Sequence, residues 1–279
     1  MVSKDIMTVG TLGIIGCPIL EDEIFHSMTK DPEAKRIFIV DTRPAVSLKE
    51  KFEAKGVPFT LIEEWDFSTN NYEIDRDSGY NVVIIMNKLG LHSDPKFLKT
   101  TLEDQIKTYQ TRFDAISLYY GMCGNGGWDV TEWAKENVDI PVFVFREKSG
   151  RVCDDCIGVA VGGPDSYYRL VKKYAGMFFV TPAIAANWDE FAKELDFCKG
   201  FEVMDIHTVA EVFEVFGYRF AVKIDTGLGI QGDLFQERCE HVAKQTGLNL
   251  ITVEPDFVDI YPTEHLYSES KAALEQNRS

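Results

Sequence analysis

Short strand-like segments that are apolar on both faces alternate with amphipathic helical segments along the whole chain. In Asn81–Asn87, for example, the apolar residues Val-Val-Ile-Ile-Met follow one another without polar alternation. Both faces of such a strand must be buried, which a parallel sheet covered by helices on each side achieves. We therefore predict an α/β fold with a mostly parallel, Rossmann-like sheet and helices on both faces, arranged as one domain or as two similar lobes around a cleft.

The strand pattern recurs at regular intervals from end to end. The predicted strands are Val9–Gly16, Arg36–Asp41, Pro58–Glu63, Asn81–Asn87, Phe113–Tyr120, Ile140–Phe145, Met177–Val180, Arg219–Ile224 and Asn249–Val253. Helical spacing of apolar residues predicts helices over Asp94–Thr111, Asp205–Val215 and Gln231–Thr246. We treat residues 1–279 as one composite domain, with 1–110 and 111–267 as candidate lobes and a polar helix and tail over 268–279.

Composition limits the partners of the protein. Its formal net charge of −16 would repel nucleic acid and anionic membrane surfaces, so we predict that neither is a partner. Apolar segments are too short to cross a bilayer, and the first residues, Met1–Asp5, lack the pattern of a signal peptide. We expect a cytoplasmic protein whose six cysteines are reduced thiols.

Residues with reactive or ligating side chains follow the predicted strands. In chain order they are Cys17, His92, Cys123, the pair Cys153 and Cys156, Thr181, and Asp225 with Thr226. Ligands of open α/β sheets bind beyond the carboxyl ends of the strands, because loops and helix N-termini meet there. We therefore expect these residues to form one site.

The cysteines favour a metal site. Three thiolates with an imidazole or a carboxylate satisfy tetrahedral Zn²⁺, whereas three thiolates with an open position suit a [4Fe–4S] cluster that binds substrate. The spacing of Cys153-Asp-Asp-Cys156 is a short chelating one that redox dithiols also use. The alternative for each cysteine is burial as a small hydrophobic residue. The candidate metal ligands are Cys17, His92, Cys123, Cys153 and Cys156.

Glycines surround Cys123 in the segment Gly121–Gly127, and glycine lets the backbone approach a ligand closely. Backbone N–H groups of such a loop can cradle an anion, although this one lacks the lysine of a P-loop and does not match G-x-G-x-x-G. The cofactor-binding candidates are Gly124, Asn125, Gly126, Thr181 and Thr226.

Two aspartates are the catalytic candidates. Asp155, beside Cys156, has the place of a general base, a metal ligand or a residue that orients one. Asp225 ends a buried strand, where its carboxylate either contacts a ligand or caps the next helix.

At these residues the chain resembles a known family. Tyr120-Gly-Met-Cys-Gly-Asn-Gly126, Cys153-Asp-Asp-Cys156-Ile-Gly, Phe179-Val-Thr-Pro182 and Ile224-Asp-Thr-Gly227, in this order, resemble the DUF1638 family of anaerobic archaea and bacteria. Cys17 and Leu91-His-Ser93 extend the resemblance to nearly the whole chain.

Members of that family are often encoded beside corrinoid-dependent methyltransferases for methylamines and related methyl donors. The resemblance therefore implies a place in anaerobic methyl-transfer metabolism. It carries over Cys17, His92, Cys123, Asp155 and Cys156 as site residues. The chain departs from the family pattern at Asp154, where many members have His, and at the added Cys153, which leaves the fourth ligand open.

Two functions are compatible with these features, and whether the protein turns over a substrate stays open. The first is a metalloprotein in which Zn²⁺ presents a substrate thiol as a thiolate to a methyl group, or an Fe–S cluster passes electrons. The second is an accessory protein that binds a corrinoid, a corrinoid protein or methyltransferase, or a small methylated ligand without turnover. Its aromatic walls would be Tyr119, Tyr120, Trp128, Trp133 and Trp188. A thiol redox protein is a third possibility.

Overall fold

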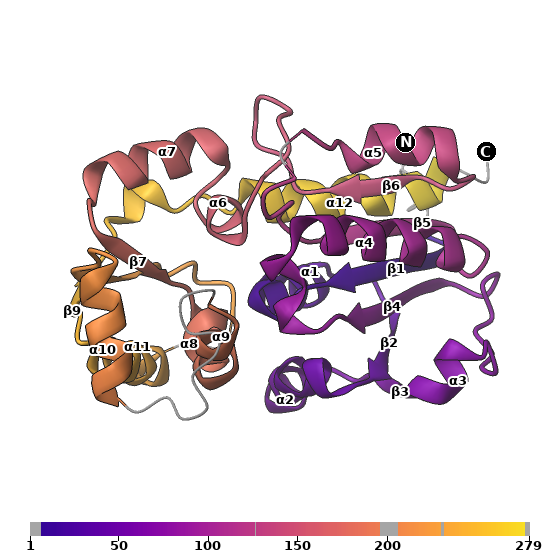
Figure 1. The fold of residues 1–279 in the computed structure, drawn as a ribbon. Helices are drawn as coiled ribbons and strands as arrows, with labels where there is room; N and C mark the ends of the chain where they lie inside the picture. The colour runs from indigo at the N-terminus through magenta and orange to yellow at the C-terminus, as the bar shows by residue number, and fades with distance from the viewer. Residues whose placement is uncertain (1–6, 126, 196–205, 230–231, 277–279) are drawn as a thin grey trace, which may run out of the picture.

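Two parallel sheets organise the chain, a larger one from its first half and a smaller one from its second half (Figure 1). The computed structural model describes residues 7–125, 127–195, 206–229 and 232–276. The strand order is β3-β2-β4-β1-β5-β6 in the larger sheet and β7-β8-β9 in the smaller one. The strands are β1 (Gly10–Gly16), β2 (Arg36–Asp41), β3 (Thr60–Glu63), β4 (Tyr80–Met86), β5 (Ala115–Tyr119), β6 (Val142–Val144), β7 (Met177–Val180), β8 (Phe220–Lys223) and β9 (Asn249–Thr252).

Helices connect successive strands, as the parallel pairing requires. The α-helices are α1 (Glu21–Lys30), α2 (Val46–Lys55), α3 (Glu64–Ser68), α4 (Pro95–Tyr109), α5 (Val130–Asn137), α6 (Cys156–Ala160), α7 (Pro164–Lys173), α8 (Pro182–Ala186), α9 (Trp188–Glu194), α10 (Ile206–Val215), α11 (Asp233–Thr246) and α12 (Tyr261–Gln276). Short 3₁₀ helices are η1 (Pro18–Leu20), η2 (Arg43–Ala45), η3 (Leu89–Ser93) and η5 (Pro255–Phe257). The predicted α/β class and parallel, Rossmann-like sheet are confirmed.

The central strand β4 explains why its sequence lacks polar alternation. Val83 and Ile85 point into one core cluster, with the apolar residues of α4 and α5. Val82 and Ile84 point into the opposite cluster, with those of α1, α2 and α12. Each fully buried Val or Ile side chain contributes roughly 1.5–3 kcal/mol relative to an exposed one. Burial on both faces therefore holds this strand in the middle of the larger sheet.

The chain passes from the larger to the smaller sheet after β6. The candidate boundary at residue 110 falls inside the larger sheet, because β5 pairs with β1. Of the segment predicted as a polar helix and tail, residues 268–276 form the second half of α12, which packs on β1, β5 and β6, and 277–279 lie outside the described residues. In α12, Ser270 and Leu274 are buried. The larger lobe is thus the larger sheet with α1–α5 and α12, and the smaller lobe is the smaller sheet with α7–α11.

The carboxyl ends of both sheets meet between the lobes. In Figure 1 the arrows of β1 and β4 point toward the smaller lobe. Helix α8, which follows β7, packs on η1 and α1, which follow β1. Gly229, beyond β8, lies so close to α1 that a Cβ on it would be 2.0 Å from Oδ1 of Asp22. Loops from both lobes therefore share one region.

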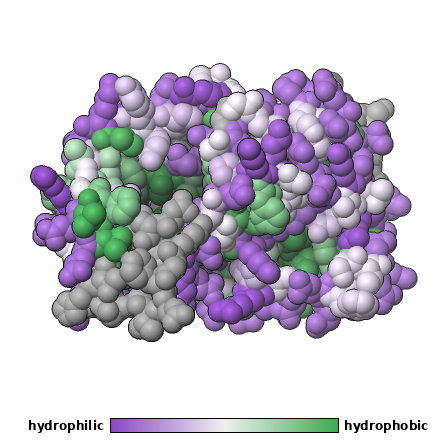
Figure 2. All heavy atoms as spheres, in the orientation of Figure 1, coloured by the Kyte–Doolittle hydropathy of each residue, from purple (hydrophilic) through white to green (hydrophobic). Residues whose placement is uncertain are grey.

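Hydrophilic side chains cover most of the coloured part of the face shown in Figure 2, in keeping with the charged composition. Within the described part of the chain, none of the helices has both the length and the apolar character needed to cross a membrane.

Candidate functional site

Three of the predicted cysteines lie on loops that meet at the carboxyl edge of the larger sheet. Cys17 directly follows β1, and its N–H donates to the carbonyl oxygen of Tyr119 in the neighbouring β5 at 3.0 Å. Cys123 lies in the loop after β5, and its N–H donates to the carbonyl oxygen of Asp154 at 2.5 Å. Cys156 begins α6, two residues further on. Strand pairing and two loop hydrogen bonds thus connect the three cysteines.

The glycines around Cys123 serve this close packing. Cys123 itself has a φ of 46° and Gly124 a φ of 86°, so two successive residues are left-handed and reverse the chain. Gly121 lies against the backbone before α6, where an added Cβ would be 2.5 Å from Cα of Asp155. A side chain at position 121 would therefore separate the loops that carry Cys123 and Cys156.

The three thiols are close enough to affect one another's ionisation. Burial raises the pKa of Cys17 to about 12, and the nearby Glu21 and Glu23 add to the shift. The pKa values of Cys123 and Cys156 are also raised, first by burial and then by Asp155 and by the other thiols of the group. Without a bound cation, these groups are neutral thiols at pH 7.

Asp155 is a charged neighbour of two of these thiols, Cys123 and Cys156. Its Oδ1 accepts a hydrogen bond from the N–H of Gly158 at 2.7 Å, so it caps α6. Burial and the adjacent Asp154 raise its pKa. Its charge raises the pKa of Cys123, Cys156 and Tyr167. The residue is therefore a helix cap and also the carboxylate nearest in sequence to the thiols.

A buried hydroxyl faces the thiols. Tyr120 is 1 % exposed, and its hydroxyl forms no hydrogen bond of ordinary geometry with a described residue. Its neighbours are Asn87 and the thiols of Cys17 and Cys123, and burial raises its pKa well above the usual value. The polar Asn87 side chain is the one group among the described residues that offsets the burial of this hydroxyl.

Three acidic residues at the start of α1 complete the site, and sequence reasoning missed them. Glu21, Asp22 and Glu23 are at most 4 % exposed. Lys51 of α2 pairs with Glu21 at 3.0 Å and with Asp22. Burial raises the pKa of Glu23 to about 8, with Asp22 adding to the shift. The sequence held a signal for this acidic group. Three consecutive acidic residues begin four positions after Cys17, which itself directly follows a predicted strand.

Two predicted metal ligands lie elsewhere. Cys153 is fully buried in the core cluster on the opposite face of the larger sheet, and its N–H donates to the carbonyl oxygen of Phe145 at 2.9 Å. His92 has its Nδ1 2.8 Å from the carbonyl oxygen of Leu89, and its ring stacks on Phe191 of α9 at 6.1 Å. Among the described residues, neither is a main electrostatic neighbour of the three thiols.

The other candidates have local structural contacts. Asn125 donates from Nδ2 to the carbonyl oxygen of Pro95 at 2.7 Å and so holds the loop on α4. Thr181 caps α8, since its Oγ1 accepts from the N–H of Ile184 at 3.3 Å. Gly126 lies outside the described residues. The predicted cofactor-binding roles of Gly124, Asn125, Gly126 and Thr181 stay predictions.

Beyond β8, Asp225 is exposed and accepts a hydrogen bond from the N–H of Gly227 at 3.3 Å. Thr226 is buried, and its hydroxyl has no hydrogen-bond partner among the described residues. The predicted catalytic role of Asp225 and the cofactor-binding role of Thr226 also stay predictions.

The side-chain arrangement is not a preformed metal cage. Within residues 7–125, 127–195, 206–229 and 232–276, no group of three or more His, Cys, Asp or Glu residues is placed to hold a metal ion. The described cysteines, Cys17, Cys123, Cys153, Cys156 and Cys239, are free thiols.

Comparison with known proteins decides the family. Residues 86–261, more than half of the chain, match the family described as "Protein of unknown function (DUF1638)". The chain belongs to the DUF1638 family. The resemblance seen in its motifs is thereby confirmed. The matched range includes Cys123, Cys156 and the whole smaller lobe, whereas Cys17 and the acidic residues of α1 precede it. No curated protein and no solved structure matches the chain.

Proposed function

We propose that this DUF1638 protein binds a thiophilic metal ion through Cys17, Cys123 and Cys156 and acts in corrinoid-dependent methyl transfer. The observation that carries the metal proposal is the meeting of three cysteines from separate loops at the carboxyl edge of one sheet. Thiolates are preferred ligands of Zn²⁺ and of Fe–S clusters.

The charges around the thiols also support a cation. The main charged neighbours of the three cysteines in the described residues are acidic, namely Glu21, Glu23, Asp154 and Asp155. These carboxylates oppose thiolate formation when no cation is present. They would stabilise a bound cation and its thiolates together.

The donor set fits a metal ion after a local rearrangement. Because no preformed cage is present among the described residues, the loop of Cys123 or the start of α6 has to move for all three thiols to bind one ion. The carboxylate of Asp155 or Glu23 is the candidate fourth ligand. A bound Zn²⁺ supplies Lewis-acid activation of a substrate thiol. Where neither carboxylate takes the fourth position, that position is open to the substrate thiol, and Asp155, whose raised pKa favours proton uptake, would accept the thiol proton.

The methyl-transfer part of the proposal is supported by the family resemblance and the gene neighbourhood it implies. The metal part can be tested separately by elemental analysis of protein purified without oxygen. We expect about one equivalent of Zn²⁺, or iron with acid-labile sulfide. Serine in place of Cys17, Cys123 or Cys156 should remove the metal.

Two other cysteines are matched controls. Cys239 is buried in α11, and Cys153 packs beside Phe145 on the opposite face of the sheet. Cys239→Ser and Cys153→Ser should therefore retain the metal. Loss of metal in Cys153→Ser alone would move the site to the Cys153-x-x-Cys156 pair. Protein without stoichiometric metal, or with metal unaffected by all three serine substitutions, would refute the proposal.

The alternative role, corrinoid binding without turnover, has less support from the aromatic residues. Trp128 and Trp133 pack edge to face at 6.4 Å, with Lys99 and Lys107 over their rings. Trp188 packs on Phe178. These ring faces are occupied by the protein's own side chains. A saturable absorbance change when cobalamin is added to metal-free protein would nevertheless favour this role.

A further inference from the structure

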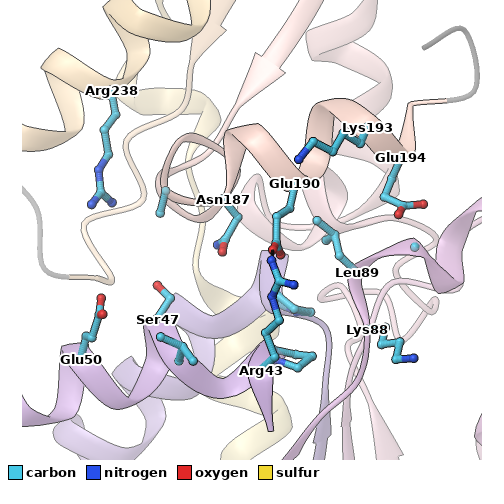
Figure 3. Close-up of a pocket in the computed structure, with 15 residues that line it drawn as sticks. Arg43, Ser47, Glu50, Lys88, Leu89, Asn187, Glu190, Lys193, Glu194 and Arg238 are labelled. Atoms are coloured by element: carbon cyan, nitrogen blue, oxygen red, sulfur yellow. Dashed lines mark hydrogen bonds and ion pairs between the residues drawn. The ribbon is translucent and has the colours of Figure 1, made fainter. Parts of the chain in front are cut away.

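A cavity of about 670 Å³ lies between the two lobes, and its lining includes Pro18, the residue after Cys17 (Figure 3). On the larger lobe it is bounded by η2, the start of α2 and the loop after β4. On the smaller lobe it is bounded by α9 and α11. This is the region beyond the carboxyl ends of β2 and β4, where open α/β sheets bind their ligands. Its volume suits a small molecule.

Cations outnumber carboxylates in this cavity, although the protein as a whole has 45 acidic and 29 basic residues. The charged lining residues are Arg43, Lys88, Lys193 and Arg238 against Glu50, Glu190 and Glu194. A local positive excess in the cleft of an acidic protein concentrates anions there.

Most of these cations form no ion pair with a described residue. Arg43 pairs with Glu190 at 2.5 Å, across the two lobes. Lys88, Lys193 and Arg238 form no ion pair within the described part of the chain. Figure 3 shows Arg238 reaching from α11 toward α2, and Lys193 projecting from α9 above Glu190. Lys193 and Arg238 thus extend from the smaller lobe over the cavity and face Arg43, whereas the Lys88 side chain points away from Arg238.

We propose that this cavity binds a small organic anion with two or more negative charges, carried by phosphate or carboxylate groups. Arg238 and Lys193 hold it from the smaller lobe, and Arg43 faces them from the larger lobe. Arginine and lysine supply charge-assisted hydrogen bonds to both kinds of oxyanion. The proposal does not depend on the metal site.

Within the cavity, the Glu190 carboxylate competes with the proposed anion for the Arg43 guanidinium. Glu190 places a negative charge inside the cavity and occupies the Arg43 guanidinium. A bound anion would be repelled by Glu190 and would compete with it for Arg43. Replacing this carboxylate should therefore strengthen anion binding, a gain that mere damage to the fold does not produce.

The test is calorimetric titration with pyrophosphate and with citrate at low ionic strength, after metal ions have been removed by a chelator and dialysis. We expect saturable binding of one molecule, and the tighter of the two probes identifies phosphate or carboxylate as the recognised group. Arg238→Ala and Lys193→Ala should each weaken binding about tenfold. Glu190→Gln should strengthen it.

Lys244→Ala is the matched control, because Lys244 is an exposed cation on α11 that does not line the cavity. It should leave the affinity unchanged. Binding of neither probe below about 10 mM would overturn the proposal. Equal affinities in the wild type, Arg238→Ala and Lys193→Ala would overturn it as well.

Discussion

The backbone of Gly121 lies so close to Asp155 that a Cβ on Gly121 would be 2.5 Å from the Asp155 Cα. This contact holds the loop after β5 against the start of α6. The contact therefore keeps Cys123 and Cys156 in the same region. A single methyl group added at position 121 would push the two backbone segments apart.

Gly121→Ala should lower the free energy of unfolding by about 1–3 kcal/mol, because backbone atoms at this contact have to move apart. Urea denaturation measures the change. Gly127→Ala is the control, since a Cβ there meets no atom within 4 Å. Equal free energies of unfolding for Gly121→Ala and Gly127→Ala would contradict the prediction, because the loop and α6 would then accommodate the methyl group without loss of stability.

Alkylation of Cys123 and Cys156 by iodoacetamide should be slow in chelator-treated native protein. Both are partly exposed, but their raised pKa values leave little thiolate at pH 8. We expect a rate far below that of a free thiol, rising about tenfold per pH unit between pH 7 and pH 10 because the thiolate fraction rises tenfold per unit below the pKa. Mass spectrometry of each labelled peptide gives the rates. A plateau near pH 8 would mean an ordinary thiol pKa.

Zn²⁺ binding should release about one proton for each thiolate ligand, because the metal-free thiols are protonated. The affinity should consequently rise with pH. Calorimetry in buffers of different ionisation enthalpy counts the protons. Binding without proton release would exclude the thiols as ligands.

Glu23→Gln should change how stability depends on pH. The folded protein holds the Glu23 proton up to about pH 8, whereas the unfolded chain releases it near 4.5. The native state thus binds more protons in this window, so the wild type loses stability as pH rises through it. Glu23→Gln should be more stable than the wild type at pH 8 by about 2 kcal/mol and should gain less at pH 5.

Thermal or urea denaturation across pH 5–8.5 measures the Glu23 effect. Glu53→Gln, an exposed substitution on α2, should follow the wild-type profile. Parallel profiles for the wild type and Glu23→Gln would contradict the prediction.

Lys51→Met should lower the free energy of unfolding by about 3–5 kcal/mol, because it leaves two buried carboxylates without their cation. The Lys51 side chain is 12 % exposed and its partners Glu21 and Asp22 are 0 % and 3 % exposed. Adding Glu21→Gln and Asp22→Asn to Lys51→Met should restore much of the loss. Lys135→Met removes an exposed pair and should cost less than about 1 kcal/mol. Similar losses for the two lysine variants would contradict the prediction.

Secondary structure was largely predictable. The strands Arg36–Asp41 and Met177–Val180 have their predicted bounds as β2 and β7. The other strands begin and end within a few residues of the prediction. Apolar content and periodicity are local properties, and they decide whether a segment can be buried on one face or on two. The choice of neighbouring strand is not local, so the sequence did not predict that β5 and β6 join the larger sheet and that β7 begins the smaller one.

By itself the sequence determined the α/β class and the order in which thiols, imidazole and hydroxyls follow the strands. The carboxyl ends of parallel strands lie at one edge, so chain order alone predicted that Cys17 and Cys123 would be near each other. Only the tertiary structure decided which candidates meet. It directs Cys153 into the opposite core and His92 onto α9, because loop paths depend on long-range packing. Likewise, Glu21–Glu23 look like surface residues in sequence, and their burial depends on Lys51 and the smaller lobe.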